Sequence, residues 1–223
     1  MHPSFSGTDP TRAGPTCAAG HIEADAVCFP HQLKELTMSR LPVLDEQSLD
    51  SDQAKVVEAI RRGPRGPNAN ATVGPFGVWL RSPAFATPAQ ELGAHCRFGA
   101  ALPRDVSEFA IILTAKHWRA QFEFWAHARI ALEEGIPEEV VEAVRIGEPL
   151  VLERTDLALV HRLVTEYFAT NRVSQETYQE ALNTFGETGL VDLVGTVGYY
   201  GLVSATLNVF EVQVPAGEEE PLP

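Results

Sequence analysis

Residues 104–147, RDVSEFAIILTAKHWRAQFEFWAHARIALEEGIPEEVVEAVRIG, carry the pattern that decides the fold. The first part of this segment has the period of a helix, and its apolar side chains recur on two opposite sides. A helix that is apolar on both sides is expected to be buried on both. Glu108 heads one of these stripes, so the pattern predicts a carboxyl group inside the protein. The stripes consist of Val106, Phe109, Ala110 and Leu113, and of Glu108, Ile111, Ile112 and Ala115.

Glu108 has a second interpretation as part of a helix cap. In a D-x-x-E variant of the capping box, Asp105 is the N-cap residue and Glu108 occupies position N3. The spacing alone favours this cap, whereas the apolar stripe favours burial.

The segment QFEFWAH, residues 121–127, sets two titratable groups among large aromatic side chains. Glu123 and His127 are four residues apart, so on a helix they share one face and can touch. Three interpretations stay open: a surface ion pair, a partly buried pair, and a metal site with Glu108 as a third ligand. The aromatic neighbours favour partial burial, and a buried pair of this kind can transfer a proton near neutral pH.

The rest of the chain also has a helical pattern, so the predicted fold class is all-α. Residues 68–83 are interrupted by Gly and Pro and predict an ordered loop with a short helical turn, whose Phe76 and Trp79 pack inward or line a cavity. The one strand signal is FEVQV at residues 210–214. Helices are predicted at residues 52–62, at 88–98, from 103 to a break near 117–120, within 135–148, around 160–167, within 172–187 and at 190–210.

Composition divides the chain into three parts. Residues 1–37 are rich in Pro, Gly, Thr and Ala without periodicity, and we expect a disordered or non-native extension there. Residues 38–216 are expected to form a single helical domain, and residues 217–223 an acidic, solvated tail.

The totals exclude several classes of function. The formal net charge is -13, with 30 acidic and 17 basic residues, which leaves no basic surface for nucleic acid. The three cysteines are too few and too irregularly spaced for a disulfide or zinc framework, which predicts a reducing, cytoplasmic setting. No signal peptide is visible, and the apolar residues 190–210 are interpreted as a buried helix rather than a membrane span.

Residues 104–147 resemble the carboxymuconolactone decarboxylase family, whose alkyl hydroperoxidase D branch shares the fold. The resemblance lies in a Glu that opens an apolar helix, a break, a Glu between aromatic residues, a His four residues later and a Gly eight after that. These residues are Glu108, Glu123, His127 and Gly135. It extends over roughly residues 40–215 and implies a helical bundle that assembles as a homo-oligomer, a trimer or a hexamer.

The chain departs from the peroxidase branch of that family. By resemblance, the redox C-x-x-C of that branch falls on Ala120 and Glu123 here, so the thiols that would attack peroxide and resolve the intermediate are missing. The remaining cysteine of the domain, Cys96, is expected to be buried and inert. The decarboxylase branch, which needs no metal or organic cofactor, is the better match.

The sequence therefore predicts a cofactor-independent acid/base enzyme, lyase-like, that acts on a small carboxylated lactone or related organic acid. His127 moves the proton, Glu123 orients it, and Glu108 supports the pair or acts as a second acid/base. Phe76, Trp79, Phe122 and Trp125 are expected to form an apolar wall that excludes water. No metal, cofactor, nucleic acid or membrane is expected as a partner. Two alternatives remain: a peroxidase-related redox protein and a non-catalytic oligomeric scaffold.

Overall fold

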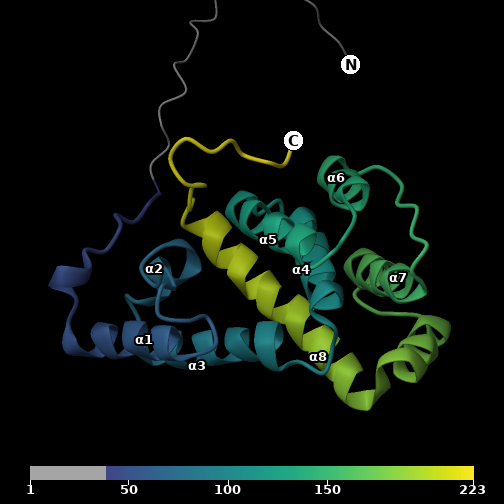
Figure 1. Ribbon diagram of the computed structural model, residues 1–223, viewed down its shortest axis with the longest axis horizontal. Helices are drawn as coiled ribbons and strands as arrows, with labels where there is room; N and C mark the ends of the chain where they lie inside the picture. Colours follow the sequence, from purple (N-terminus) through teal and green to yellow (C-terminus); the bar gives the residue numbers. More distant parts are fainter. Residues whose placement is uncertain (1–38) are drawn as a thin grey trace, which may run out of the picture. The chain divides into compact units, whose positions relative to one another are not determined.

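The structure of the chain is a computed structural model that describes residues 39–223 (Figure 1). Residues 39–223 are all-α, as the sequence predicts, and they contain no strand. The predicted extension, residues 1–37, lies outside the described residues. The elements are η1 (Glu46–Ser48), α1 (Ser51–Arg62), α2 (Gly74–Trp79), α3 (Pro83–Ala94), the π-helical turn η2 (His95–Gly99), α4 (Arg104–Trp118), α5 (Gln121–Glu133), α6 (Glu138–Ile146), α7 (Thr155–Thr170) and α8 (Gln175–Val209).

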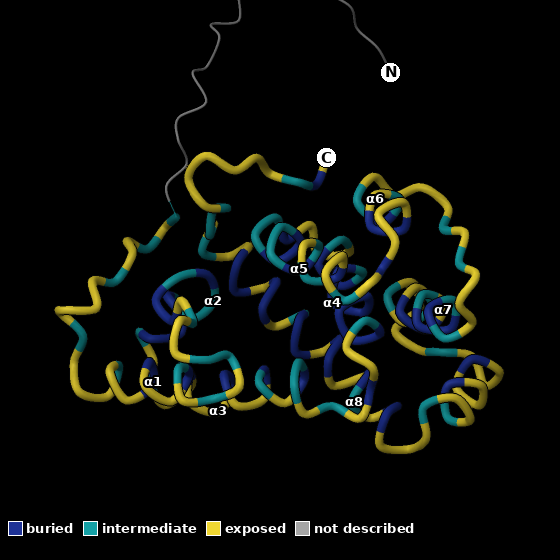
Figure 2. Tube along the Cα trace, viewed as in Figure 1, coloured by how far each residue is buried: buried dark blue, intermediate teal, exposed yellow. Residues whose placement is uncertain are grey.

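Helix α4 lies between two apolar cores, as the apolar residues on two of its sides require. Phe109 belongs to a core formed with α5, α6, α7 and α8, and so does Ile112, which the sequence pattern placed on the opposite stripe. Ile111 belongs to the other, formed with α1, α2, α3 and the second half of α8. All three side chains are fully buried, and each stabilises the fold by roughly 2 kcal/mol at ordinary transfer values. Figure 2 shows the buried residues gathered along α4 and α8.

The predicted break between α4 and α5 is confirmed. Helix α4 ends at Trp118, and Arg119 adopts a left-handed backbone conformation with φ of 52°. Helix α5 begins two residues later, at Gln121, and packs against α4. Because the chain turns back at Arg119, side chains early in α4 can meet side chains of α5.

The third helix was placed too late by the sequence pattern. The pattern predicts it at residues 88–98, but α3 begins at Pro83 and carries Pro88 in its interior. Proline suits the first turn of a helix because the missing N–H has no partner there, and Pro83 takes that position first. The helix then continues into η2, which contains Cys96 and Arg97.

The expected strand FEVQV does not form. Helix α8 ends at Val209, and Glu211 then takes a left-handed conformation with φ of 50°, which ends any extended run. One backbone hydrogen bond, from Arg40 N to Phe210 O at 3.0 Å, connects this segment to residues near the start of the described chain.

Helix α8 contains the apolar residues 190–210 and is kinked at Gly186, whose φ is 70°. Leu193, Val197 and Leu207 face the cores, as a buried helix requires. The helix is long and apolar enough to cross a membrane by length and composition, and half of that apolar window is buried inside the protein. Its other side is exposed, with Val191 at 70% and Val194 at 58% of their possible surface.

The C-terminal residues are only partly a solvated tail. Glu218, Glu219 and Glu220 are exposed, as expected. Leu222, however, is buried in the first core, and its backbone exchanges two hydrogen bonds with the Gln121 side chain at 2.8 and 3.0 Å. One apolar residue among the acidic ones therefore holds the segment against α5.

Two glycine substitutions should change stability in opposite directions. A Cβ on Gly93 of α3 would overlap the phenol of Tyr199, so Gly93→Ala should destabilise the protein by about 1–3 kcal/mol through overpacking. Gly195 of α8 has nothing within 4 Å of an added Cβ, so Gly195→Ala should stabilise it by about 0.5–1 kcal/mol through helix propensity. Urea unfolding of both variants measures the difference, and a loss of equal size in both would contradict the packing of α3 on α8.

Candidate functional site

The centre of the site is a contact between Glu108 of α4 and His127 of α5. The Glu108 carboxylate lies 2.6 Å from Nδ1 of the imidazole. Both residues are buried, with 1% of Glu108 and 9% of His127 exposed. Since a carboxylate only accepts hydrogen bonds, Nδ1 carries the hydrogen, and the lone pair of the neutral imidazole is on Nε2.

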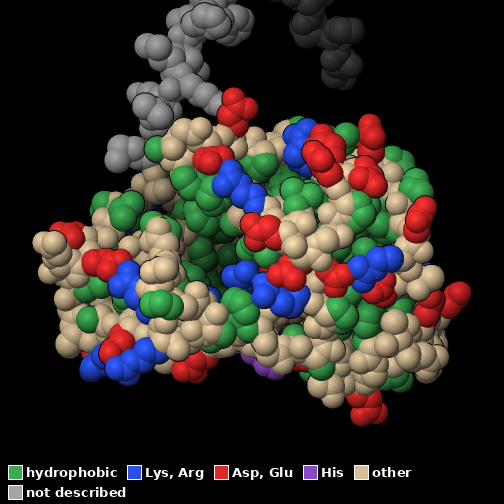
Figure 3. Space-filling model, in the orientation of Figure 1, with side chains coloured by type: hydrophobic (Ala, Val, Ile, Leu, Met, Phe, Trp, Pro, Cys, Tyr) green, Lys and Arg blue, Asp and Glu red, His purple; other side chains and the backbone are tan. Residues whose placement is uncertain are grey.

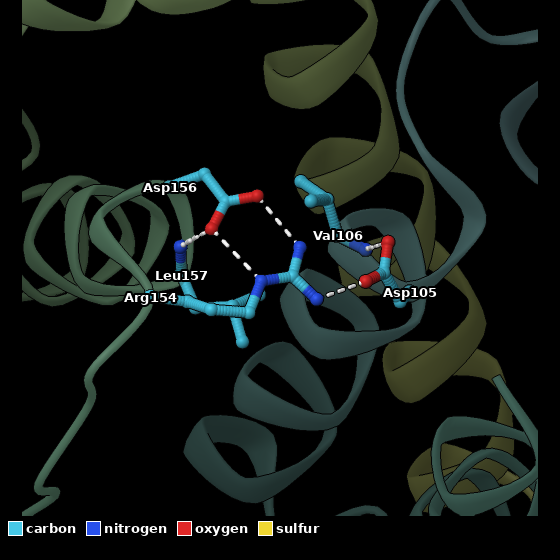
Figure 4. A network of polar contacts seen from close by, with 5 residues as sticks. All are labelled: Asp105, Val106, Arg154, Asp156 and Leu157. Atoms are coloured by element: carbon cyan, nitrogen blue, oxygen red, sulfur yellow. Dashed lines mark hydrogen bonds and ion pairs between the residues drawn. The ribbon is translucent and has the colours of Figure 1, made fainter. Parts of the chain in front are cut away.

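The interpretation of Glu108 as a helix cap is wrong. The N-cap residue of α4 is Pro103, and no side chain caps this end. Asp105 instead accepts from its neighbour Val106 N at 2.8 Å and pairs with Arg154, which also binds Asp156 (Figure 4). Asp105 is therefore engaged in an ion pair with Arg154 and does not cap helix α4.

A guanidinium contacts the other oxygen of Glu108. Arg97 of η2 donates from Nε to Glu108 Oε1 at 3.3 Å. Burial raises the pKa of Glu108, but His127 and Arg97 more than offset this, so the pKa lies below its ordinary value. Glu108 is therefore ionised at neutral pH. Arg97 was not predicted as a site residue, because nothing in its spacing connects η2 with residues 108–127.

Glu123 does not form the expected pair with His127. Its Oε2 accepts a hydrogen bond from Ser204 Oγ of α8 at 2.9 Å, and Oε1 has no hydrogen-bonding partner among residues 39–223. The side chain is 1% exposed, and burial raises its pKa well above the ordinary value. The carboxylate that contacts the imidazole is therefore Glu108 of α4. Glu123, whose pKa is raised by burial, is a neutral carboxylic acid on the α8 side of the site.

Tyr200 of α8 is a further residue that sequence reasoning missed. Its ring meets the His127 ring edge to face, with centroids 4.9 Å apart. Burial raises the pKa of its phenol well above the ordinary value, so the hydroxyl keeps its proton. The signal that could have found it is the adjacent pair Tyr199–Tyr200, two polar aromatic residues in the largely apolar residues 190–210.

The four predicted wall residues divide into two groups. Phe76 and Trp79 are in edge contact at 5.9 Å, and Trp79 continues to Tyr199 at 6.2 Å and so to Tyr200. Phe122 and Trp125 contact each other at 5.7 Å on α5. The two groups approach where the Phe122 ring packs on Gly74 at the start of α2, since a Cβ there would lie 2.8 Å from the ring.

One face of the molecule is hollowed. Figure 3 shows a depression with hydrophobic walls between the positions of α2 and α8, and positively charged side chains lie at its edge.

The interpretation of Glu108, Glu123 and His127 as one metal site does not fit the geometry. Within residues 39–223 no three His, Cys, Asp or Glu side chains are placed to hold one ion. Cys96 is buried, and burial raises the pKa of its thiol, which works against the thiolate that redox chemistry needs. Cys17 and Cys28 lie outside the described residues.

A separate cavity of about 420 Å³ lies between α4, α6 and α7 and contains none of the predicted site residues. His117 and His161 line it, and burial lowers the pKa of both. The His117 ring is stacked on Phe168 at 3.8 Å. Neither imidazole has a carboxylate partner among the described residues, so proton transfer is better supported at His127, where Glu108 orients the base.

No model of a known protein family matches the sequence, and no curated protein matches it significantly.

The two buried glutamates should affect stability with opposite dependence on pH. Above the ordinary value of 4.5, the unfolded chain loses the Glu123 proton while the folded protein keeps it, so this residue costs stability as pH rises. Glu123→Gln should therefore be about 1 kcal/mol more stable than wild type at pH 7, with a gain that vanishes below pH 4.5. Thermal unfolding measured from pH 4 to 8 gives this profile.

Glu108→Gln is the matched control with the opposite sign. The stability from a lowered pKa is complete above pH 4.5 and is lost as pH falls through the folded-state value. Removal of this charge from a buried pair should cost about 3 kcal/mol at neutral pH and less in acid. If both variants shifted in the same direction at pH 7, the assignment of one neutral and one ionised glutamate would be wrong.

Proposed function

We propose that the chain is a cofactor-independent acid/base enzyme of the carboxymuconolactone decarboxylase type, acting on a small carboxylated lactone or related organic acid. The observation that carries the proposal is the buried contact of 2.6 Å between Glu108 and His127. A base that is oriented by a carboxylate and held away from bulk water is the arrangement that general base catalysis needs.

In this proposal His127 Nε2 is the atom that takes or returns the proton. Glu108 holds the imidazole in one tautomer and stabilises the imidazolium as it forms, the role that was first given to Glu123. Arg97 keeps Glu108 ionised through its hydrogen bond at 3.3 Å. These groups thus come from α4, α5 and η2. Helix α4 packs against both α5 and η2, and all three elements also contact α8.

Glu123 takes the role of acid. A neutral carboxylic acid in an apolar site can donate a hydrogen bond to a developing enolate oxygen. In a decarboxylation, the bond between the ring carbon and the carboxylate carbon breaks, carbon dioxide leaves, and the electron pair enters the ring as an enolate. Nε2 of His127 takes a proton from solvent, and the imidazolium so formed adds this proton to the ring carbon, which returns the imidazole to its neutral form. Glu123 lies on the same helix as His127, and its Oε1 has no hydrogen-bonding partner among residues 39–223.

The specific fold type belongs to the proposal as well. The turn at Arg119 brings Glu108 back to His127, as the resemblance implies. The redox alternative is disfavoured because the one described cysteine, Cys96, is buried and its pKa is raised.

The exposed face of α8 supports assembly into a homo-oligomer, for which the resemblance implies a trimer or hexamer. We define the α8 face as the exposed residues at helical spacing Val191, Val194, Gly198, Leu202, Ala205 and Val209. The face carries no charge, although the whole chain has a net charge of -13. A second copy of the same neutral face is the partner that meets no electrostatic penalty.

His127→Asn should abolish turnover without unfolding the protein. The variant keeps the size of the side chain but loses the base, so kcat should fall about 100-fold or more. Purified protein is incubated with a panel of small carboxylated lactones, and carbon dioxide release is measured. His161→Asn, in the separate cavity, is the control and should keep full activity. Equal activity of both variants would refute the assignment of His127.

Val194→Glu should dissociate the oligomer. The residue is 58% exposed in the single chain, so the charge costs little there but is costly inside an interface. Light scattering coupled to size-exclusion chromatography gives the mass. Val151→Glu, at a position that is 87% exposed in a loop, is the control. A monomeric wild type would refute the oligomer.

A further inference from the structure

Arg65 is a partly buried cation that lacks a carboxylate partner within residues 39–223. Its guanidinium donates one hydrogen bond, from Nη1 to Gln90 O at 3.2 Å. The same group lies over the Phe76 ring, 5.0 Å from the centroid. Every guanidinium has five N–H donors, so most of this one's donors have no protein acceptor. A half-buried guanidinium whose donors lack acceptors lowers the stability of the fold, unless a bound ligand supplies those acceptors.

Arg65 is connected to the proton-transfer groups through a series of aromatic contacts. Phe76, on which it rests, begins the aromatic series through Trp79 and Tyr199 to Tyr200, which contacts His127. Burial lowers the pKa of Arg65. The nearby Tyr199 and Tyr200 raise this pKa, and the charge of Arg97 lowers it. The Gln90 carbonyl that Arg65 binds lies on α3, which continues directly into η2, the turn that carries Arg97. Arg97 in turn contacts one oxygen of Glu108, whose other oxygen contacts His127.

The charge in this region is positive within an acidic protein. Arg65 and Arg97 are both cations, Glu108 is a single anion, and Glu123 is neutral because burial raises its pKa. The chain as a whole has a net charge of -13, which repels anions at long range. A local excess of guanidinium groups beside aromatic walls is the arrangement that selects a small anion.

We propose that Arg65 and Arg97 form an anion subsite that binds a carboxylate of the substrate beside His127. This inference rests on the proposed function and narrows it, since the substrate must be an anion under the conditions of the reaction. Arg97 is bound to Glu108 only through Nε, so its two Nη groups remain for the ligand. Arg65 supplies the second guanidinium group. Two planar guanidinium groups offer paired N–H donors, which match the two oxygens of a carboxylate.

Binding of two probes that differ only in charge tests the subsite. The probes are a γ-butyrolactone with one carboxylate on its ring and the methyl ester of the same molecule, measured by calorimetry with the full chain. Wild type should bind the carboxylate at least about tenfold more tightly than the ester. Arg65→Gln should remove most of that preference and leave the affinity for the ester within about twofold.

Arg162→Gln is the matched control, because Arg162 pairs with Glu180 on the exposed surface of α7 and α8. It should leave both affinities unchanged. Arg65→Gln should also unfold at a temperature equal to or above that of wild type, because it removes an unpaired charge. A purely structural arginine would give the reverse result: a lower unfolding temperature and an equal loss for both probes.

The same measurements in the His127→Asn background separate this inference from the proposed function. If the carboxylate preference persists there and depends on Arg65, the subsite holds even when no lactone is turned over. If wild type binds acid and ester equally, or if Arg65→Gln keeps the preference, the subsite is overturned, whatever the fate of catalysis.

Discussion

The buried charge on Glu108 is the constraint around which the site is arranged. An ionised carboxylate with 1% of its surface exposed needs partners for both oxygens, and these come from two other elements. His127 on α5 takes one oxygen and Arg97 on η2 takes the other. These two contacts connect α4 with α5 and with η2. The burial of Glu108 therefore influences both the position of the His127 imidazole and the packing of these elements. Loss of either partner would leave a charge in the apolar interior.

Glu108 and Glu123 show how one residue type serves two roles. Both are almost completely buried, yet the pKa of Glu108 is lowered and that of Glu123 is raised. The difference lies in their neighbours, because Glu108 faces an imidazole and a guanidinium whereas Glu123 faces the Ser204 hydroxyl. A hydroxyl does not compensate the desolvation of a carboxylate, so Glu123 keeps its proton. One group can then act as anion and the other as acid at the same pH.

The sequence predicted the burial of the candidate site residues better than their contacts. Opposite apolar stripes on residues 106–115 required burial of Glu108, and the break near 117–120 allowed it to reach α5. The spacing of Glu123 and His127 was misleading, because residues four apart on a helix can make contact but do not always do so. The carboxylate that contacts His127 is Glu108, on another helix. Arg97, Tyr200 and Ser204 were missed for a related reason. Each reaches the site only through tertiary packing, which local periodicity does not encode.

The unfavourable features of the molecule gather in one place, and this favours an enzyme over a scaffold. Glu123 is a buried acid with an unpartnered oxygen, Arg65 is a cation without a carboxylate among the described residues, and Tyr200 is a buried phenol. All three are connected to His127 through the packing of α5, α8 and the aromatic series. A structural core has no use for such groups, and selection for stability alone would replace them with apolar residues. Scattered over the fold they would be unrelated defects, but around a single imidazole oriented by a carboxylate they support the proposed site, in which stability is given up for chemistry.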